Sequence, residues 1–305
     1  MWLEVNKKAN IILTHNCNLR CKHCYLDAKP CKENFNYNYE KTIDIIDKLK
    51  IIGFREIMFT GGECMTFPKL EDLIKYAKSK NFVVSIFTNG MIYNEKIFDL
   101  VDIVHISIDG SEYIHNNIRQ NSNSFANIIK VLDYLKKIDR YVIIQMTINN
   151  KNYNDLDFLI NLTLDHLNIR TVKFAFTSSS GRAVENDIYS DKSMIDYVNN
   201  RIPKLFKETK YHIQFLTNLF NKYDFENYCL TGIFEFPFWI DIPKNNYYLL
   251  NSEIAKIHNL KDLNIETIEI ESANFLKILN DNREKIEYND NIDIEFELIN
   301  LLGGK

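Results

Sequence analysis

The chain has 305 residues, of which 46% are hydrophobic and 26% charged, a composition that excludes a largely disordered protein. Its formal net charge is −4 with both signs interspersed, so we expect no nucleic acid partner. The sequence contains no secretory signal and no apolar run of about 18 residues, so we also expect no membrane partner and a cytoplasmic protein.

Six short apolar runs rich in β-branched residues predict buried strands, each followed by a polar or glycine-containing turn. These runs cover 11–14, 56–60, 82–88, 103–108, 141–148 and 171–177. Helical periodicity predicts helices at 39–52, 70–77, 94–100, 125–135, 154–166 and 191–209. We expect the last helix to be interrupted at Pro203, because proline removes a backbone donor.

The alternation of strands and helices predicts an α/β fold with a parallel sheet, because the connections are long enough to be crossover helices. Six such units are fewer than the eight of a complete barrel, so we predict a partial (β/α)6 TIM-like barrel over 1–210. The rhythm changes from about 211, and 239–250 reads as a strand, a turn and a strand. We therefore predict a smaller α+β region over 211–305.

Three cysteines, Cys17, Cys21 and Cys24, lie in the stretch CNLRCKHCY after the first predicted strand. In a reducing compartment, such clustering indicates metal binding or catalysis before disulfides. One interpretation is a tetrahedral zinc site. Its candidates for a fourth ligand are His15, His23 and Cys31. The other is a four-iron cluster, where three protein thiolates leave one iron open to an external ligand.

Further motifs follow two later strands, where the active site of a barrel lies. The second strand ends in FTGGE, whose glycines allow close backbone approach and whose carboxylate suits an ammonium group. The fourth ends in ISIDG, which places Ser107 and Asp109 on one face of the strand. Ten residues further, Arg119 offers a planar fork that suits a carboxylate.

The CxxxCxxC pattern after the first strand, followed by GGE after the second, resembles the radical S-adenosylmethionine (radical SAM) superfamily. The resemblance implies one [4Fe–4S] cluster on the three cysteines, whose open iron binds the amino and carboxylate groups of S-adenosylmethionine. The residues that it assigns to the methionine amino group are Gly61, Gly62 and Glu63. It also implies that His23 lies near the adenine and Tyr25 near the nucleoside.

The SxDG and HxxxR motifs resemble the peptide-modifying branch of this superfamily, often called SPASM or twitch proteins. In that branch the residues that correspond to Ser107 and Arg119 help to bind S-adenosylmethionine, and Asp109 would face the substrate. Gln145 or Thr147 on the fifth strand would touch the ribose. The TNG of residues 88–90 and the SSSGRA of residues 178–183 also resemble the branch, although a turn explains TNG equally well.

The resemblance weakens beyond about residue 185. The branch normally carries several cysteines there for auxiliary clusters, whereas Cys229 is the only cysteine after Cys64. We therefore predict a degenerate, cysteine-poor extension without an auxiliary cluster. Cys229 has two interpretations, a free thiol in the core or, if it faces the cleft, a hydrogen-atom donor to a substrate radical.

The resemblance implies an enzyme that cleaves S-adenosylmethionine reductively and uses the 5′-deoxyadenosyl radical to modify a ribosomally made peptide, by epimerisation, crosslinking or a related reaction. The expected partners are a precursor peptide and a reductant such as flavodoxin or ferredoxin. Because the first predicted strand begins close to residue 1, we expect leader recognition by a separate protein or by 211–305. The alternatives are a radical SAM enzyme acting on a small molecule and a non-catalytic metal-binding regulator, which would have no use for Glu63 and Arg119.

Overall fold

The computed structural model describes residues 8–177, 180–210, 213–217, 238–249 and 258–264 of the chain. Ten strands lie in these ranges, and they form one sheet with the order β10-β9-β8-β1-β2-β3-β4-β5-β6-β7. Their bounds are β1 (Lys8–Thr14), β2 (Glu56–Gly61), β3 (Val83–Thr88), β4 (Ile103–Ser107), β5 (Tyr141–Ile148), β6 (Ile169–Phe176), β7 (Gln214–Thr217), β8 (Phe238–Asp241), β9 (Asn246–Leu249) and β10 (His258–Asn259).

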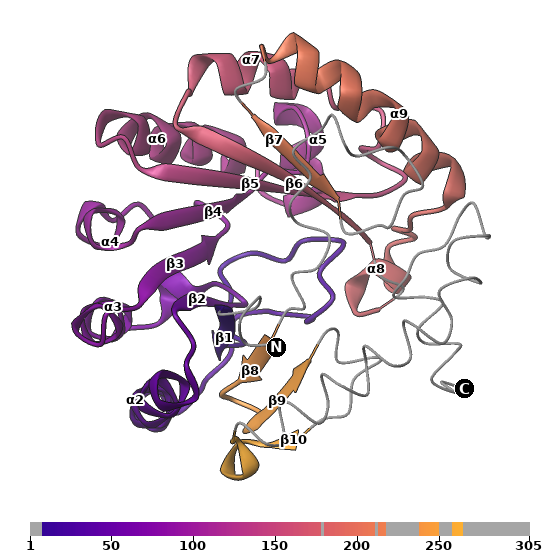
Figure 1. Cartoon of the computed structure of the whole chain (residues 1–305). Helices are drawn as coiled ribbons and strands as arrows, with labels where there is room; N and C mark the ends of the chain where they lie inside the picture. The colour runs from indigo at the N-terminus through magenta and orange to yellow at the C-terminus, as the bar shows by residue number, and fades with distance from the viewer. Residues whose placement is uncertain (1–7, 178–179, 211–212, 218–237, 250–257, 265–305) are drawn as a thin grey trace, which may run out of the picture.

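The six strands expected from the sequence are β1 to β6, and each pairs in parallel with the next. The predicted partial barrel is therefore confirmed. Figure 1 shows the sheet as a curved, open wall, with α2, α3, α4 and α6 along its outer side and the loop after β1 on its inner side. The carboxyl ends of all six strands meet at one edge, as in other parallel barrels.

The helices between the strands also follow the predicted order. Their bounds are α2 (Phe35–Ile52), α3 (Leu70–Ser79), α4 (Glu95–Leu100), α5 (Glu112–Arg119), α6 (Ser124–Lys137), α7 (Phe158–Asp165), α8 (Arg182–Glu185) and α9 (Lys192–Glu208), with the short 3-10 helices η1 (Cys64–Thr66) and η3 (Leu260–Asp262). The sequence did not predict α5 or α8. None of the described helices combines the length and apolar character that crossing a membrane requires.

The expected interruption of the last helix is wrong. Pro203 lies inside α9, which continues without a break to Glu208. The missing backbone donor costs roughly 3 kcal/mol, but α9 buries Val198, Ile202 and Leu205 against the sheet, and each such side chain contributes about 1.5–3 kcal/mol. Burial therefore outweighs the lost hydrogen bond.

The sheet extends beyond the predicted barrel at both edges. On one side β7 pairs in parallel with β6. On the other, β8 pairs in parallel with β1, and β8 and β9 form the predicted antiparallel hairpin. The strand, turn and strand predicted for 239–250 are thus confirmed, but the pairing of β8 with β1 was not predicted. It brings residues from the expected C-terminal region next to the first strand of the barrel.

The two faces of the barrel strands differ in polarity. On β5, Val142, Ile144, Met146 and Ile148 belong to the apolar core between sheet and helices. The alternate residues point the other way, and at the carboxyl end of the strand these are Gln145 and Thr147. Neighbouring strands repeat this pattern: in register, Gln145 lies between Ser107 of β4 and Lys173 of β6. A row of polar side chains therefore lines the inner face near the strand ends.

Candidate functional site

The loop of residues 15–34, which we call the cysteine loop, connects β1 to α2 and carries the three predicted ligands. Cys17 and Cys21 are buried and Cys24 is partly buried, and none of the three forms a disulfide. Cys17 and Cys21 pack with Leu19 and Ala28 in a small apolar cluster separate from the main core. The loop thus holds two of its thiols in a sheltered environment at the carboxyl end of β1.

Each buried thiol contacts a polar side chain that follows a barrel strand. The Nδ2 atom of Asn89, just after β3, lies 3.9 Å from Cys17 Sγ, and the Nη1 atom of Arg119, at the end of α5, lies 3.7 Å from Cys21 Sγ. Burial raises the pKa of Cys17 to about 12. Burial also raises the pKa of Cys21, although the Arg119 guanidinium acts in the opposite direction. From the sequence, the TNG motif was either part of the site or a simple turn. The contact of Asn89 with Cys17 places it in the site.

Arg182, from the GRA motif, fastens the cysteine loop. Its Nε donates to the carbonyl of Cys21 (2.9 Å), and its Nη1 donates to the carbonyl of Ala28 (2.8 Å) and to the carboxylate of Asp27 (2.6 Å). A Cβ on the preceding Gly181 would clash with the backbone carbonyls of residues 24 and 25. The buried Arg182 side chain therefore holds the backbone around the thiols.

The two glycines of FTGGE let the end of β2 pass against the start of the cysteine loop. A Cβ on Gly62 would lie 2.5 Å from the carbonyl oxygen of Asn16 and 2.8 Å from that of His15. One on Gly61, whose φ is 141°, would clash with the carbonyl of Thr14. The glycines therefore permit close approach, as predicted, but the partner seen here is the chain segment that leads to Cys17.

Replacing Gly62 by Ala should push the cysteine loop away from β2. We expect a loss of roughly 1–3 kcal/mol in the free energy of unfolding, as for other overpacked sites, together with reduced iron incorporation. Chemical denaturation and iron analysis after anaerobic reconstitution measure the two effects. Gly53→Ala is the comparison, because Gly53 has a φ of 108° and no atom within 4 Å of its added Cβ.

Gly53→Ala should cost roughly 1–2 kcal/mol through backbone strain alone and leave the iron content unchanged. Wild-type iron content and stability in Gly62→Ala would contradict the close contact between β2 and the cysteine loop.

Glu63 is buried, and its carboxylate is engaged within the protein. Oε1 accepts from Met65 N and Thr88 Oγ1, each at 2.9 Å, and Oε2 accepts from Asn89 N at 2.7 Å. Burial raises the pKa of Glu63, and the hydrogen bonds from Asn89 and Met65 oppose this shift. In this arrangement Glu63 ties η1 to the end of β3 and so positions Asn89. Its contact with a methionine amino group stays a prediction.

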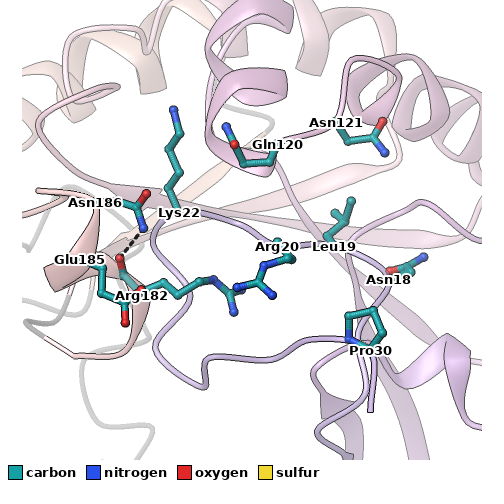
Figure 2. A pocket seen from close by; sticks show the side chains of 10 residues that line it. All are labelled: Asn18, Leu19, Arg20, Lys22, Pro30, Gln120, Asn121, Arg182, Glu185 and Asn186. Atoms are coloured by element: carbon teal, nitrogen blue, oxygen red, sulfur yellow. Dashed lines mark hydrogen bonds between the residues drawn. The ribbon is translucent and has the colours of Figure 1, made fainter.

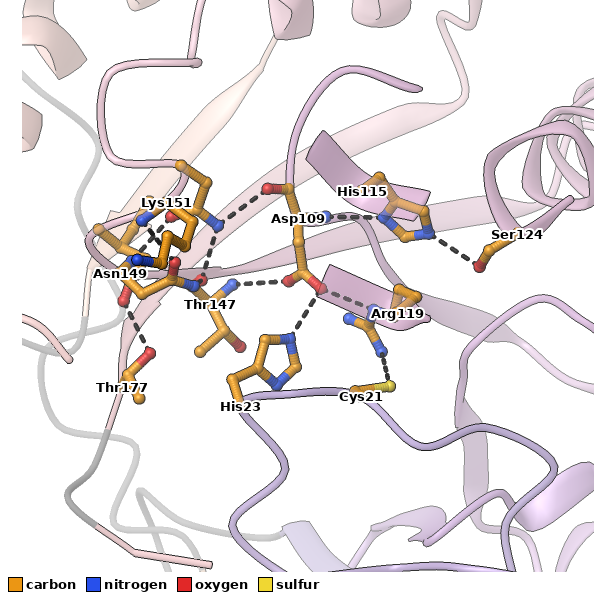
Figure 3. Close-up of polar contacts among 12 residues, drawn as sticks. Cys21, His23, Asp109, His115, Arg119, Ser124, Thr147, Asn149, Lys151 and Thr177 are labelled. Carbon is orange, nitrogen blue, oxygen red and sulfur yellow. Dashed lines mark hydrogen bonds and ion pairs between the residues drawn. The ribbon is translucent and has the colours of Figure 1, made fainter. Parts of the chain in front are cut away.

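Asp109 is the centre of a buried polar network (Figure 3). Its Oδ2 accepts from Arg119 Nε at 2.6 Å and lies 2.8 Å from His23 Nε2, and its Oδ1 accepts from Thr147 N at 3.3 Å. Burial alone would raise the pKa of Asp109, but the charges of Arg119 and then His23 hold it well below its usual range. The carboxylate therefore joins β4, α5, β5 and the cysteine loop, and through Arg119 it is connected to Cys21.

The backbone of Asp109 is fixed as well. Its N–H donates to His115 Nδ1 (3.1 Å), so Nδ1 carries no proton and Nε2 donates to Ser124 Oγ (3.0 Å). Burial, followed by the charge of Arg119, lowers the pKa of His115 to about 3, which keeps the ring neutral. Asn152 Nδ2 donates to the carbonyl of Asp109 (2.8 Å). His115 is the histidine of the HxxxR motif, for which no role was predicted, and Asn152 was not predicted as a site residue.

Several polar groups on the inner face have no hydrogen-bond partner among the described residues. They include the hydroxyl of Ser107, the side-chain amide of Gln145 and the Nη2 atom of Arg119, whose Nε and Nη1 contact Asp109 and Cys21. Ser107 and Arg119 are nevertheless almost fully buried. Polar atoms that stay unpaired but accessible on the inner face are available to bind a ligand.

The remaining predicted residues lie in different settings. Tyr25 is half-exposed on the cysteine loop. Cys31 is exposed, with its Sγ 3.6 Å from Glu33 Oε1, and Cys64 is fully buried, with its Sγ 3.3 Å from the carbonyl of Phe87. Thr147 contributes its backbone N–H to Asp109, as described above. Cys229 lies outside the described residues.

The cysteine loop also contacts the C-terminal hairpin. His15 Nε2 lies 3.0 Å from Oδ2 of Asp241, a buried residue at the end of β8. The backbone N–H of His15 donates to Glu33 Oε1 (2.7 Å), so both ends of the loop are tied together. Because β8 pairs with β1, Asp241 reaches the site from a segment 226 residues away. No sequence signal pointed to this contact.

The three cysteines fit an iron–sulfur cluster better than a zinc ion. Within the described ranges, no three His, Cys, Asp or Glu side chains are grouped so as to hold one metal ion. A zinc site needs four ligands about 2.0–2.3 Å from a single point, whereas a cluster takes each thiolate on a separate iron. Of the candidates for a fourth zinc ligand, Cys31 Sγ contacts Glu33, and His15 and His23 contact Asp241 and Asp109 through Nε2. Binding to iron displaces the thiol protons that burial favours.

Comparisons with known proteins identify the family and the fold. The family model of the Radical SAM superfamily matches residues 11–163. The chain is 30% identical over 154 residues to the sporulation killing factor maturation protein SkfB of Bacillus subtilis (strain 168), a match that covers 48% of this chain and 37% of SkfB. It is 28% identical over 206 residues to Fe-coproporphyrin III synthase of Methanosarcina barkeri (strain Fusaro / DSM 804), covering 64% and 51%. The matches thus span between 37% and 51% of the length of these relatives.

Solved structures share the fold. Streptococcus suis SuiB bound to S-adenosylmethionine aligns with a TM-score of 0.66 at 12% identity, over 85% of this chain and 64% of SuiB. SuiB bound to precursor peptide SuiA aligns with a TM-score of 0.62 at 13% identity, over 79% of this chain and 58% of SuiB. At such low identity the likeness establishes the fold alone.

Proposed function

The chain belongs to the radical SAM superfamily, and on that premise we propose that it is an enzyme that modifies a ribosomally made peptide by epimerisation, crosslinking or a related reaction. The cofactors of this family are a [4Fe–4S] cluster and S-adenosylmethionine. When bound, they supply the electron and the carbon–sulfur bond cleavage that yield a 5′-deoxyadenosyl radical able to abstract hydrogen from a substrate. The protein holds these groups, orients the substrate and excludes water.

In this proposal Cys17, Cys21 and Cys24 hold the cluster. The observation that carries the proposal is that each buried thiol contacts a polar side chain following a barrel strand, Asn89 at Cys17 and Arg119 at Cys21. Hydrogen bonds and positive charge next to cluster sulfurs are among the means by which proteins set cluster potentials.

The groups left free on the inner face would bind S-adenosylmethionine. The Nη2 atom of Arg119 and the hydroxyl of Ser107 would receive the methionine carboxylate, because charge-assisted hydrogen bonds of this kind are strong in buried sites. Asp109 would act by holding Arg119 in place. Gly61, Gly62 and Glu63 would shape the amino end of the site through the contact of β2 with the cysteine loop.

The nucleoside would lie farther along the same face. The ring of His23 is held by Asp109 and would support the adenine, with Tyr25 beside it. Gln145, in register between Ser107 and Lys173, would face the ribose. On the inner face of the barrel, these groups would shield the radical from water.

A peptide substrate is supported by the relatives. SkfB is a maturation protein for sporulation killing factor, and SuiB has been crystallised with precursor peptide SuiA. The open inner side of the partial barrel would admit a substrate of that size. A separate leader-recognition protein and a hydrogen-donating role for Cys229 remain parts of the proposal.

A small-molecule substrate is the second candidate. It is favoured by the match to Fe-coproporphyrin III synthase, which extends over more of this chain than the match to SkfB. The cofactor residues would have the same roles in both cases. The substrate that stimulates cofactor cleavage therefore distinguishes the two.

The test is an anaerobic assay of the reconstituted protein with dithionite and S-adenosylmethionine, in which 5′-deoxyadenosine is quantified by chromatography. Candidate peptides are those encoded by short reading frames next to the gene. We expect one of them to stimulate 5′-deoxyadenosine release at least about tenfold over the uncoupled reaction. Mass spectrometry of the peptide in heavy water then detects either a loss of hydrogen or an incorporation of deuterium.

Stimulation by a porphyrin or another metabolite, with every peptide inactive, would replace the peptide proposal by the second candidate. No 5′-deoxyadenosine under any condition, in protein that contains about four irons per chain, would contradict radical chemistry itself.

A further inference from the structure

A polar pocket lies against the cysteine loop, between that loop, the α5–α6 connection and α8 (Figure 2). Its volume is about 510 Å³. The lining side chains that matter below are Arg20, Lys22, Gln120, Asn121, Arg182 and Glu185. None of them is assigned to the cluster, S-adenosylmethionine or substrate in the function proposed above.

The pocket is positively charged although the chain as a whole is negative. Its lining has three cationic side chains against one carboxylate, while the net charge of the chain is −4. Arg182 is paired with Asp27, but among the described residues Lys22 Nζ contacts only the neutral Asn117 Oδ1 (2.7 Å). Arg20 is exposed and forms no ion pair with any described residue. Within the described ranges, two cations therefore have no compensating carboxylate.

The pocket lies close to the thiols, because residues of the cysteine loop line it. Leu19 lines the pocket, and its backbone N–H donates to Cys17 Sγ at 3.4 Å. Arg20 and Lys22, on either side of Cys21 in the chain, also line it. The buried thiols contact Asn89 and Arg119, neither of which lines the pocket. A group bound in the pocket would thus be near the cluster and separate from the substrate side.

We propose that this pocket is the docking surface for a small acidic electron-transfer protein of the flavodoxin type. The inference rests on the proposed function, because only a redox-active cluster needs a donor. In each encounter the reduced flavin loses one electron and the oxidised cluster gains one, and no bond is formed or broken. Complementary charge speeds such encounters and suits the small, transient interfaces of redox partners.

Charge reversal tests the surface directly. The test variant is Arg20→Glu/Lys22→Glu, and the matched control is Lys130→Glu/Lys137→Glu, which alters two exposed cations of α6 and changes the net charge equally. The probe is a purified acidic flavodoxin carrying a fluorophore, titrated with each protein. At low salt we expect the dissociation constant to rise about tenfold in the test variant and by less than about twofold in the control. Wild-type binding should weaken as salt is added.

A second variant, outside the cysteine loop, shows whether the loss of binding comes from the charge and not from a distorted loop. Asn121→Asp adds one negative charge from the α5–α6 connection and keeps the side-chain oxygen that accepts from Asn123 N (2.9 Å). We expect it to weaken flavodoxin binding about threefold at low salt, in the same direction as the double reversal.

Kinetics separate this inference from the proposed function. Stopped-flow absorbance follows oxidation of the reduced flavodoxin by the reconstituted protein, and dithionite replaces flavodoxin in a parallel 5′-deoxyadenosine assay. The test variant should lose about tenfold in the flavodoxin reaction and keep its dithionite activity. Failure of wild type with dithionite would count against the proposed function.

Normal dithionite activity with equal flavodoxin binding and rates in the test and control variants would overturn the docking surface alone. The same holds if the charge reversals weaken only binding of the peptide substrate, which would assign the pocket to an acidic peptide.

Discussion

Cys24→Ala is expected to abolish both iron binding and 5′-deoxyadenosine formation. With three thiolates the chain should hold about four irons, and a cluster left with two protein ligands should be lost during reconstitution. Iron and sulfide analysis, together with the electron paramagnetic resonance signal of the dithionite-reduced protein, measures the change. Cys17→Ala and Cys21→Ala should behave in the same way, because a cluster needs all three ligands.

Cys31→Ala is the matched control for these variants. It removes a thiol from the same loop, but Cys31 is exposed, and its Sγ contacts Glu33 instead of the other thiols. We expect unchanged iron content and an unchanged resonance signal. If Cys31→Ala removed metal as completely as Cys24→Ala, four protein thiolates would be bound, and the site open to S-adenosylmethionine would not exist.

The sequence predicted the barrel because its strands are buried on the side that faces the helices. Apolar runs such as 103–108 and 141–148 therefore stand out, and their order along the chain fixes a parallel sheet. The pairing of β8 with β1 could not be predicted from such runs. A four-residue strand distant in sequence carries no sign of the strand that it joins.

The types of site residue were easier to predict than their partners. The loop position of the three cysteines follows from spacing alone. The partners of Asp109, in contrast, depend on strand register, which brings the N–H of Thr147 and the ring of His23 to one carboxylate. Likewise, nothing in the sequence indicates that Gly62 faces Asn16, because close approach of two backbones is a property of tertiary packing.

Asp109→Asn is expected to lower the rate of 5′-deoxyadenosine formation at least about 100-fold. The amide has nearly the shape of the carboxylate, but it cannot balance the charge of Arg119 or accept from all of its present partners. Arg119 would then shift, and with it the groups near Cys21 and the carboxylate of S-adenosylmethionine. Displacement of a positioning group by about 1 Å is enough for an effect of this size.

The same substitution should also destabilise the fold, because it leaves a buried guanidinium without its partner. Loss of one member of a buried ion pair typically costs roughly 3–5 kcal/mol, and denaturant unfolding measures this directly. Asp133→Asn is the control, since Asp133 is itself two-thirds exposed although its partner His166 is buried. We expect that control to change stability by less than about 1 kcal/mol and activity not at all.

A double variant distinguishes positioning from mere support of the fold. In Asp109→Asn/Arg119→Gln the buried guanidinium is removed together with its partner, so part of the lost stability should return, whereas 5′-deoxyadenosine formation should stay low because the site has lost its guanidinium. If activity recovered in parallel with stability, Arg119 would serve the fold alone, and the methionine carboxylate would be bound elsewhere. If the double variant were as unstable as Asp109→Asn, the unpaired charge would not be the cause of the loss. Stability and catalysis must therefore separate in this cycle if the Asp109 and Arg119 pair orients the cofactor.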